Sequence, residues 1–264
     1  MLTEYHIHLI SNQEKIPPTT IEKDYVLSWV LSGLSVLDSK EHYIFRGGTA
    51  LKKVYYPDFR YSEDLDFIYS HGLNVESILK DVNTISQFIK DRSNMDIRIK
   101  TYEIPISGRL QIQAGFTGPL HRGGDNFIEI DIVDFATPIE VPFQMAIRTP
   151  YPDILVENKV VVVHIMDMVT DKLFAMSDRP EPRDLYDLYE IIRREKLSLE
   201  IIRSQFKQKH AILLNINTLL SPHRISQYRN LWEIRLSHQV RMLPKFEEVI
   251  EVVIHFFKQK ETET

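Results

Sequence analysis

The feature that most constrains the fold is a short unit in which a strand, a double-glycine turn, a helix and a second strand follow one another. The apolar run Tyr43-Ile44-Phe45 predicts a buried strand, and it leads almost directly into Gly47-Gly48-Thr49. Adjacent glycines let a backbone approach a ligand and turn its N–H groups outward, while Thr49 is suited to cap the helix that Ala50 begins. This helix must stop before Pro57. The unit therefore predicts a phosphate-binding turn at the start of a helix.

A pair of carboxylates follows this turn. Asp64 and Asp66 are separated by one residue, so in a strand they point the same way while Leu65 and Phe67 point to the core. Such a pair suits a hard cation. Taken singly, Gly-Gly-Thr is a common turn before a helix and Asp-x-Asp is a common solvated strand end. Their order and proximity favour nucleotide chemistry, which needs phosphate donors close to metal ligands.

Residues 128–132 alternate isoleucine with acidic side chains. The isoleucines share one face of the expected strand, which leaves Glu129 and Asp131 on the other. A half-buried strand with one polar face explains this pattern without any function. A third carboxylate beside Asp64 and Asp66 would instead help to hold a second cation or activate a nucleophile. Spacing alone does not rank Glu129 against Asp131.

Composition limits the class of protein. The 264 residues, of which 43% are hydrophobic, are enough for one large domain or two intimate ones. Cysteine is absent, which excludes disulfides, zinc–thiolate sites and thiol nucleophiles and favours a reducing compartment. Residues 1–10 do not resemble a secretory signal, and no apolar run is long enough to cross a bilayer. We therefore expect a cytoplasmic protein with no membrane span.

Charge bears on possible partners. A formal net charge of −5 argues against a protein that coats nucleic acid, although it allows a local RNA site. Basic residues gather at Lys52-Lys53 and in residues 193–196. Clusters of this size are either solvated helix faces or groups that steer a substrate.

Periodicity predicts a mixed first half and a helical second half. Besides the unit described above, strands are expected at residues 97–99, 109–114 and 128–132. Helices are expected at about residues 19–37, 75–90, 166–176, 183–196, 198–220, 225–242 and 246–258. The expected domains are therefore an α/β core over residues 1–163 and a helical domain over residues 164–264.

The helical half has its own polar cluster, consisting of Lys172, Arg179, Arg183, Asp184 and Asp187. Asp184 and Asp187 are three residues apart and share a helix face. A structural explanation is available, because an acidic residue in the first turn of a helix complements the dipole and a lysine can extend from an apolar face to solvent. The residues alone do not decide between this explanation and a site.

Four motifs in order resemble the AbiEii/AbiGii toxin family of nucleotidyltransferase-like proteins. They are residues 45–51 (FRGGTAL), 61–67 (YSEDLDF), 172–175 (KLFA) and 183–188 (RDLYDL). Residues 21–26 and Trp232 with residues 246–249 are similar to the N-terminal and C-terminal signatures of that family, so the resemblance covers nearly the whole chain.

The resemblance implies an α/β (α+β) fold, with a polymerase-β-type nucleotidyltransferase core built on a mixed sheet and followed by an α-helical region. It also implies the toxin of a toxin–antitoxin or phage-defence pair, with a cognate antitoxin as partner. Members of the family bind nucleoside triphosphates, and some transfer a nucleotide to the 3′ end of tRNA. The expected cofactor is Mg2+, and the expected acceptor is an RNA such as tRNA, held locally.

The resemblance also implies roles for individual residues. In the α/β half, Gly47, Gly48 and Thr49 would hold the triphosphate, and Asp64 and Asp66 would bind magnesium. Asp131 would be the third carboxylate and metal ligand, since Asp predominates in such triads. One departure is Thr49, because the wider superfamily often has serine after a single glycine; either hydroxyl can serve.

In the helical half, the resemblance implies that Lys172 contacts the triphosphate with Arg183 close by. Asp187, or Asp184 beside it, would complete the catalytic set.

Two alternatives stay open. The acceptor could be a hydroxyl group of a protein or of a small molecule, with the same chemistry. The chain could also be a non-catalytic nucleotide-binding module, although its intact Gly-Gly-Thr and Asp-x-Asp motifs favour an enzyme.

Overall fold

The computed structural model describes residues 1–121, 126–154 and 159–258. The chain divides into two compact units. The first consists of Met1–Thr137 and Pro142–Val163, and the second of Pro138–Val141 and His164–Thr264. The short segment Pro138–Val141 thus leaves the first unit and packs with the second.

The first unit is built on a mixed β-sheet, which confirms the expected α/β class. Within the described residues the sheet has seven strands in the order β3-β4-β5-β2-β1-β7-β6. Strands β2 and β5 are parallel, as are β1 and β7, and the other neighbours are antiparallel. The strands are β1 (Tyr43–Arg46), β2 (Asp64–Tyr69), β3 (Asp96–Glu103), β4 (Arg109–Thr117), β5 (Phe127–Val133), β6 (Phe143–Ala146) and β7 (Lys159–Val162).

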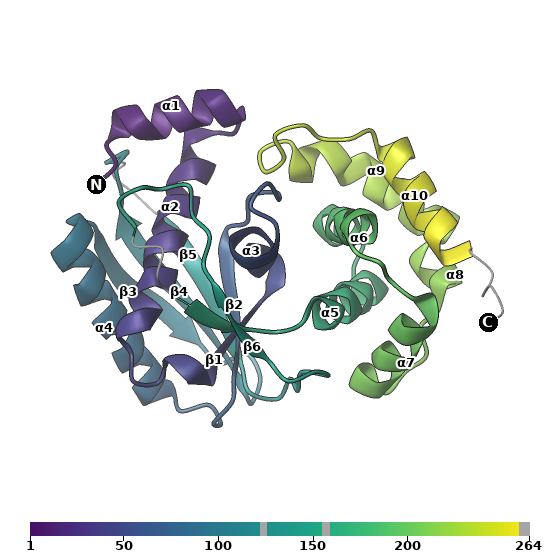
Figure 1. Cartoon of the computed structure of the whole chain (residues 1–264), viewed down its shortest axis with the longest axis horizontal. Helices are drawn as coiled ribbons and strands as arrows, with labels where there is room; N and C mark the ends of the chain where they lie inside the picture. Colours follow the sequence, from purple (N-terminus) through teal and green to yellow (C-terminus); the bar gives the residue numbers. More distant parts are fainter. Residues whose placement is uncertain (122–125, 155–158, 259–264) are drawn as a thin grey trace. The chain divides into compact units, whose positions relative to one another are not determined.

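Helices α2 and α4 pack together on the sheet (Figure 1). Their approach is close at Gly33, where a Cβ atom would lie 2.7 Å from Cγ2 of Ile85. The helices of this unit are α1 (Glu4–Glu14), α2 (Pro18–Gly33), α3 (Gly47–Ala50) and α4 (Val75–Ser93). Single turns also occur: the 3₁₀ turns Leu34–Val36 and Lys40–His42, and a π-helical turn, Leu51–Tyr55, that continues α3.

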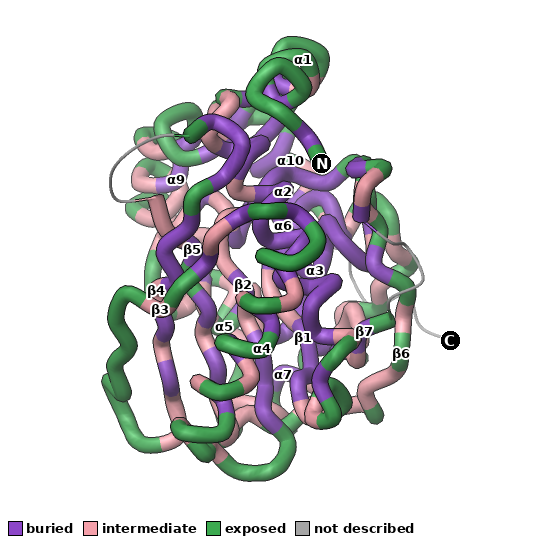
Figure 2. Tube along the Cα trace, turned by 90° about the vertical axis from the view of Figure 1, so that its left-hand side faces the viewer, coloured by how far each residue is buried: buried purple, intermediate pink, exposed green. Residues whose placement is uncertain are grey.

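The core of the first unit follows from the alternation along its strands. The isoleucines of β5 are buried, as are Leu65 and Phe67 of β2 and the apolar side of α4. Figure 2 shows the buried residues concentrated in α2 and the central strands. Each fully buried aliphatic side chain contributes about 1.5–3 kcal/mol to folding. The hydrophobic side of β2 and β5 therefore fixes the register that places their acidic side chains on the other side.

The second unit is helical. Within the described residues it contains α5 (Ile165–Asp178), α6 (Pro182–Arg194), α7 (Leu199–His210), α8 (Ile216–Leu219), α9 (Pro222–Leu236) and α10 (Phe246–Lys258). Helix α6 packs against α5, α9 and α10. Segment Pro138–Val141 is held here because the Ile139 N–H donates to the buried Asp167 carboxylate at 2.9 Å. No helix in the described residues has the length and apolar character needed to cross a membrane.

Several elements differ from the predictions. The helix expected over residues 198–220 is two helices, because Ala211 adopts a left-handed conformation (φ 57°) that ends α7. The helix expected over residues 225–242 begins at Pro222 and ends at Leu236. Strands β6 and β7 have only four residues each, and α1 buries only Ile7 and Ser11, so none of the three has a pattern long or regular enough to predict.

Candidate functional site

The acidic residues of β2 and β5 form two neighbouring pairs. In the parallel register of these strands, Asp66 lies beside Asp131 and Asp64 lies beside Glu129. Neighbouring strands are about 4.8 Å apart, so the side chains of each pair lie close together on one face of the sheet. The structure thus places the four carboxylates that the sequence singled out in the first half at two neighbouring pairs of positions on paired strands.

The glycine turn lies against this acidic face. Gly47 has a positive φ of 79°, and a Cβ atom there would lie 2.1 Å from Oδ2 of Asp66. At Gly48, a Cβ atom would lie 2.8 Å from Nη2 of Arg60 and 3.1 Å from Oγ of Ser62. Both glycines are therefore needed for close approach, the first to a proposed metal ligand and the second to a buried arginine.

The prediction that Thr49 caps the following helix is wrong. Helix α3 begins at Gly47 and its N-cap is Arg46, so Thr49 lies inside the first turn. The Thr49 side chain is buried, and its hydroxyl donates to the backbone carbonyl of Asp64. Thr49 thus ties the turn to the start of β2, and its hydroxyl is engaged within the protein.

The prediction that Lys52 and Lys53 form a solvated face or steer a substrate is also wrong, because they are 6% and 1% exposed. The Lys52 ammonium donates to the carbonyl oxygens of Phe59 (3.0 Å) and Pro57 (3.3 Å), and it lies 3.9 Å from the centre of the Tyr61 ring. Burial lowers the pKa of Lys52. Lys52 therefore shapes the loop that carries Arg60 towards Gly48.

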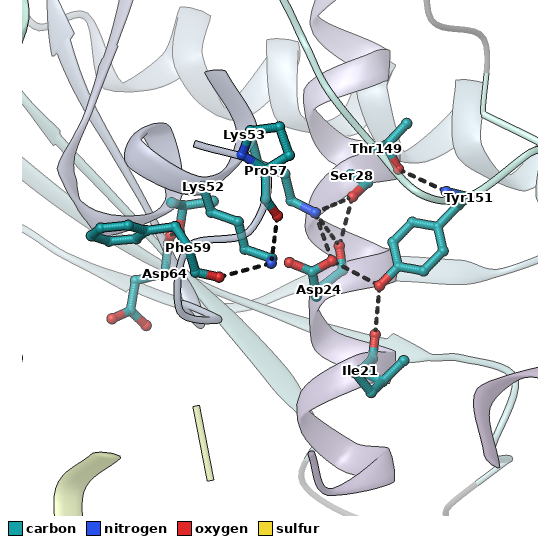
Figure 3. Close-up of polar contacts among 11 residues, drawn as sticks. Ile21, Asp24, Ser28, Lys52, Lys53, Pro57, Phe59, Asp64, Thr149 and Tyr151 are labelled. Atoms are coloured by element: carbon teal, nitrogen blue, oxygen red, sulfur yellow. Dashed lines mark hydrogen bonds and ion pairs between the residues drawn. The ribbon is translucent and has the colours of Figure 1, made fainter. Parts of the chain in front are cut away.

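Lys53 follows the glycine turn and ties it to α2 through a buried network of polar contacts (Figure 3). Its ammonium lies 2.6 Å from Oδ2 of Asp24 and 2.8 Å from Oγ of Ser28, and the Tyr151 hydroxyl donates to the same Asp24 oxygen at 2.7 Å. Burial lowers the pKa of Lys53 to about 8, despite the opposing charge of Asp24. Burial also raises the pKa of the Tyr151 hydroxyl.

The carboxylate of Asp131 is gripped by Arg109 of β4. The Arg109 Nε atom lies 3.0 and 3.1 Å from the two Asp131 oxygens, and Nη2 donates to Oδ2. Gln111 adds a hydrogen bond to Oδ2 at 3.3 Å. These hydrogen bonds to Asp131 raise the pKa of Arg109, and the charges of Asp131 and Asp66 act in the same direction.

The donor set fits a magnesium ion. Mg2+ prefers oxygen ligands and is commonly held by one or two carboxylates together with substrate phosphates, which Asp64 and Asp66 beside a glycine turn would allow. Among the residues that the structure describes, no three acidic or histidine side chains converge as a ready metal cage. The hydrogen bonds between Arg109 and Asp131 are a physical reason why this third carboxylate does not converge with Asp64 and Asp66.

Three of the predicted residues of the second unit form an ion-pair cluster within that unit. The Lys172 ammonium of α5 lies 2.9 Å from Oδ1 of Asp184 and 2.6 Å from Oδ2 of Asp187, both on α6. The two aspartates are 4% and 0% exposed. Arg183 lies instead near Glu181, with Nε 3.4 Å from its carboxylate. The structure therefore joins Lys172, Asp184 and Asp187 and turns Arg183 to another partner.

A family model of the nucleotidyl transferase AbiEii toxin of type IV toxin–antitoxin systems matches residues 29–252. The chain belongs to the AbiEii family. It is therefore a nucleotidyltransferase toxin of a toxin–antitoxin system, and its family implies a cognate antitoxin.

The fold of this AbiEii protein is shared with a solved toxin. It is similar to MenT4, a nucleotidyltransferase toxin from Mycobacterium tuberculosis H37Rv, with a TM-score of 0.67 and 15% sequence identity over 99% of this chain and 91% of that one. Comparison with curated protein sequences gives no match.

Sequence reasoning on this AbiEii chain missed Arg109, Arg60 and the pairing of Lys53 with Asp24. Arg109 and Gln111 alternate on β4 in the same way as Glu129 and Asp131 on β5, so their shared face was visible in the sequence. What the sequence did not contain was the pairing of β4 with β5. Lys53 gave no signal, because a lysine next to another lysine usually indicates solvent.

Proposed function

We propose that this AbiEii protein transfers a nucleotide from a nucleoside triphosphate to an RNA acceptor such as the 3′ end of tRNA, in a reaction that depends on Mg2+. The observation that carries the proposal is the contact of the Gly47 turn with Asp66, next to Asp64 on the same strand face. The proposed phosphate donors of α3 and the proposed cation ligands of β2 thereby lie next to each other. The reaction would take place in the cytoplasm.

Each of these residues has a role in the proposal. Backbone N–H groups in the first turn of a helix have no partner within the helix, so those of Gly47, Gly48 and Thr49 would donate to phosphate oxygens. Asp64 and Asp66 would hold the cation. When bound, Mg2+ supplies charge neutralisation for the triphosphate and the departing pyrophosphate.

Asp131 is the third carboxylate of the proposal. It lies beside Asp66 in the sheet register, where a carboxylate oxygen could accept the proton of the acceptor hydroxyl or join the cation ligands. Either role requires that Asp131 loosen its contact with Arg109. Glu129, which lies beside Asp64, is the alternative for the same role.

The second unit would contribute Lys172 as a triphosphate contact and Asp187, or Asp184, as a further catalytic group, with Arg183 as a nucleotide-binding residue. The support for these roles is that the family match extends across both units and that Lys172 is already held in a fixed position by the two aspartates. Lys172 is 13% exposed, so a small part of its side chain remains open to solvent.

The acceptor is tested with purified protein and each of the four nucleoside triphosphates labelled at the α-phosphate. Each is incubated with tRNA, with tRNA whose 3′-terminal hydroxyls have been oxidised by periodate, with total cell protein, and with a set of small hydroxyl compounds. Label should enter intact tRNA only, and chelation of divalent ions should stop the reaction. Label in protein or in small hydroxyl compounds would contradict an RNA acceptor, and no release of pyrophosphate with any acceptor would contradict catalysis altogether.

A further inference from the structure

Arg109 is a cation already present at the acidic face. Its guanidinium contacts both oxygens of Asp131 through Nε and one of them through Nη2, and Gln111 contacts the latter oxygen as well. A carboxylate has about four lone-pair sites. Protein donors thus occupy Asp131 from the β4 side, in the paired geometry that makes arginine–carboxylate contacts strong.

The reason for such a cation lies in the sheet register. Asp66 and Asp131 are direct neighbours on parallel strands, and Asp64 lies two residues from Asp66. Like charges at a strand spacing of about 4.8 Å repel each other, so the face needs positive charge when no metal is bound. Arg109 supplies that charge at Asp131.

We propose that Arg109 competes with divalent cations for Asp131, so that the third carboxylate joins a bound cation only after Arg109 releases it. This inference rests on the proposed function of Asp64 and Asp66. It deepens that function by assigning a residue that limits metal affinity before the nucleotide arrives. Arg109 is a positioning residue here, since it acts on the site through Asp131.

The exposure of Arg109 permits this exchange. Its side chain is 37% exposed, against 21% for Asp131, so the guanidinium can leave without opening the core. Phosphate oxygens are strong alternative acceptors for a guanidinium. A triphosphate could therefore draw Arg109 away from Asp131 and couple nucleotide binding to metal binding.

The test is a Mn2+ titration of the full chain without nucleotide, with free Mn2+ followed by electron paramagnetic resonance. Removing the competitor in Arg109→Gln should tighten Mn2+ binding about tenfold, an energy of about 1.4 kcal/mol that is reasonable for a paired, partly exposed contact. Arg98→Gln on neighbouring β3 removes the same charge at a site 75% exposed and should leave Mn2+ affinity unchanged.

A double-mutant cycle with Asp131→Asn separates competition from simple repulsion between Arg109 and the metal. Under competition, Arg109→Gln has no effect on Mn2+ affinity once Asp131 is an amide. The same tightening in both backgrounds would overturn the proposal, as would unchanged affinity in folded Arg109→Gln. If that variant does not fold, Arg109→Lys takes its place. A lysine cannot hold both Asp131 oxygens in the paired geometry of a guanidinium, so we expect Mn2+ to bind about threefold more tightly. Unchanged Mn2+ affinity of Arg109→Lys would again overturn the proposal.

Failure of this inference is distinguishable from failure of the proposed function. Label transfer to tRNA together with unaltered Mn2+ binding by the Arg109 variants would reject only the competition. Tightened Mn2+ binding together with no nucleotide transfer under any condition would reject only the reaction.

Discussion

At the scale of single residues, Gly47 shows how closely the glycine turn approaches Asp66, the proposed metal ligand. Its Cα lies against Asp66, and its φ of 79° is one that side chains rarely adopt. A substitution there therefore has two effects, backbone strain and displacement of Asp66.

Gly47→Ala should lower nucleotide transfer by about 100-fold, because a displacement of about 1 Å at a catalytic group has effects of that size. Gly72 provides a matched control: its φ is 73°, but a Cβ atom there would meet nothing within 4 Å. Gly72→Ala should therefore cost about 1 kcal/mol of stability and leave transfer unchanged. Equal activity of the two variants would contradict the close contact between Gly47 and Asp66.

At the scale of elements, the buried network of Lys53, Asp24 and Tyr151 connects three parts of the first unit. Lys53 lies in the π-helical turn after the glycines, Asp24 lies in α2, and Tyr151 lies in the segment before β7. The backbone N–H of Arg148 also donates to the Lys53 carbonyl at 2.6 Å. The network thus positions the segment that follows the glycine turn.

Lys53→Met should destabilise the first unit by about 3–5 kcal/mol, because it leaves the buried Asp24 carboxylate without its cation. The double variant Asp24→Asn/Lys53→Met should recover much of this loss. Urea unfolding can be followed through Trp29 of α2 in a Trp232→Phe background, where Trp29 is the only tryptophan. A single variant as stable as the parent protein would show that the network carries little stability.

The lowered pKa of Lys53 also predicts a dependence of stability on pH. Between the folded pKa of about 8 and the ordinary value of 10.5, the unfolded chain binds the Lys53 proton and the folded chain does not. The contribution of Lys53 to stability should therefore rise with pH across this window, by at most about 1.4 kcal/mol per pH unit.

The check is the difference in unfolding free energy between the parent protein and Lys53→Met, measured from about pH 7.5 to about pH 9.5, below the ionisation range of exposed tyrosines. The unfolding free energy of the parent protein should increase relative to that of Lys53→Met as the pH rises. A constant difference would mean that Lys53 keeps an ordinary pKa in the folded state.

The elements that sequence patterns predict well are those with long periodicity. Helix α4, with apolar residues from Ile78 to Ile89 on one side, and β5, with its alternating isoleucines, both lie close to their expected bounds. The proposed metal ligands of β2 were recognisable from their period of two. Contacts that depend on strand pairing, such as Arg109 with Asp131, and on burial, such as Lys53 with Asp24, are tertiary and leave no local pattern.

At the scale of the whole molecule, the family match identifies a nucleotidyltransferase toxin, while the RNA acceptor and the metal dependence are proposals. The central claim is that the acidic face of β2 carries metal-dependent transfer. Asp66 lies at the centre of the proposed site, since it is close to Gly47 of the glycine turn and beside Asp131 in the sheet register.

The most direct measurement is transfer of labelled nucleotide to tRNA by Asp66→Asn, with Asp96→Asn on the edge strand β3 as the control for loss of one carboxylate. We expect nucleotide transfer by Asp66→Asn to fall at least about 1000-fold, since this change removes a ligand of the proposed cation. The unfolding free energy of Asp66→Asn should stay close to that of the parent protein. Asp96→Asn should keep full activity. A folded Asp66→Asn protein that transfers nucleotide at the parent rate would contradict the account.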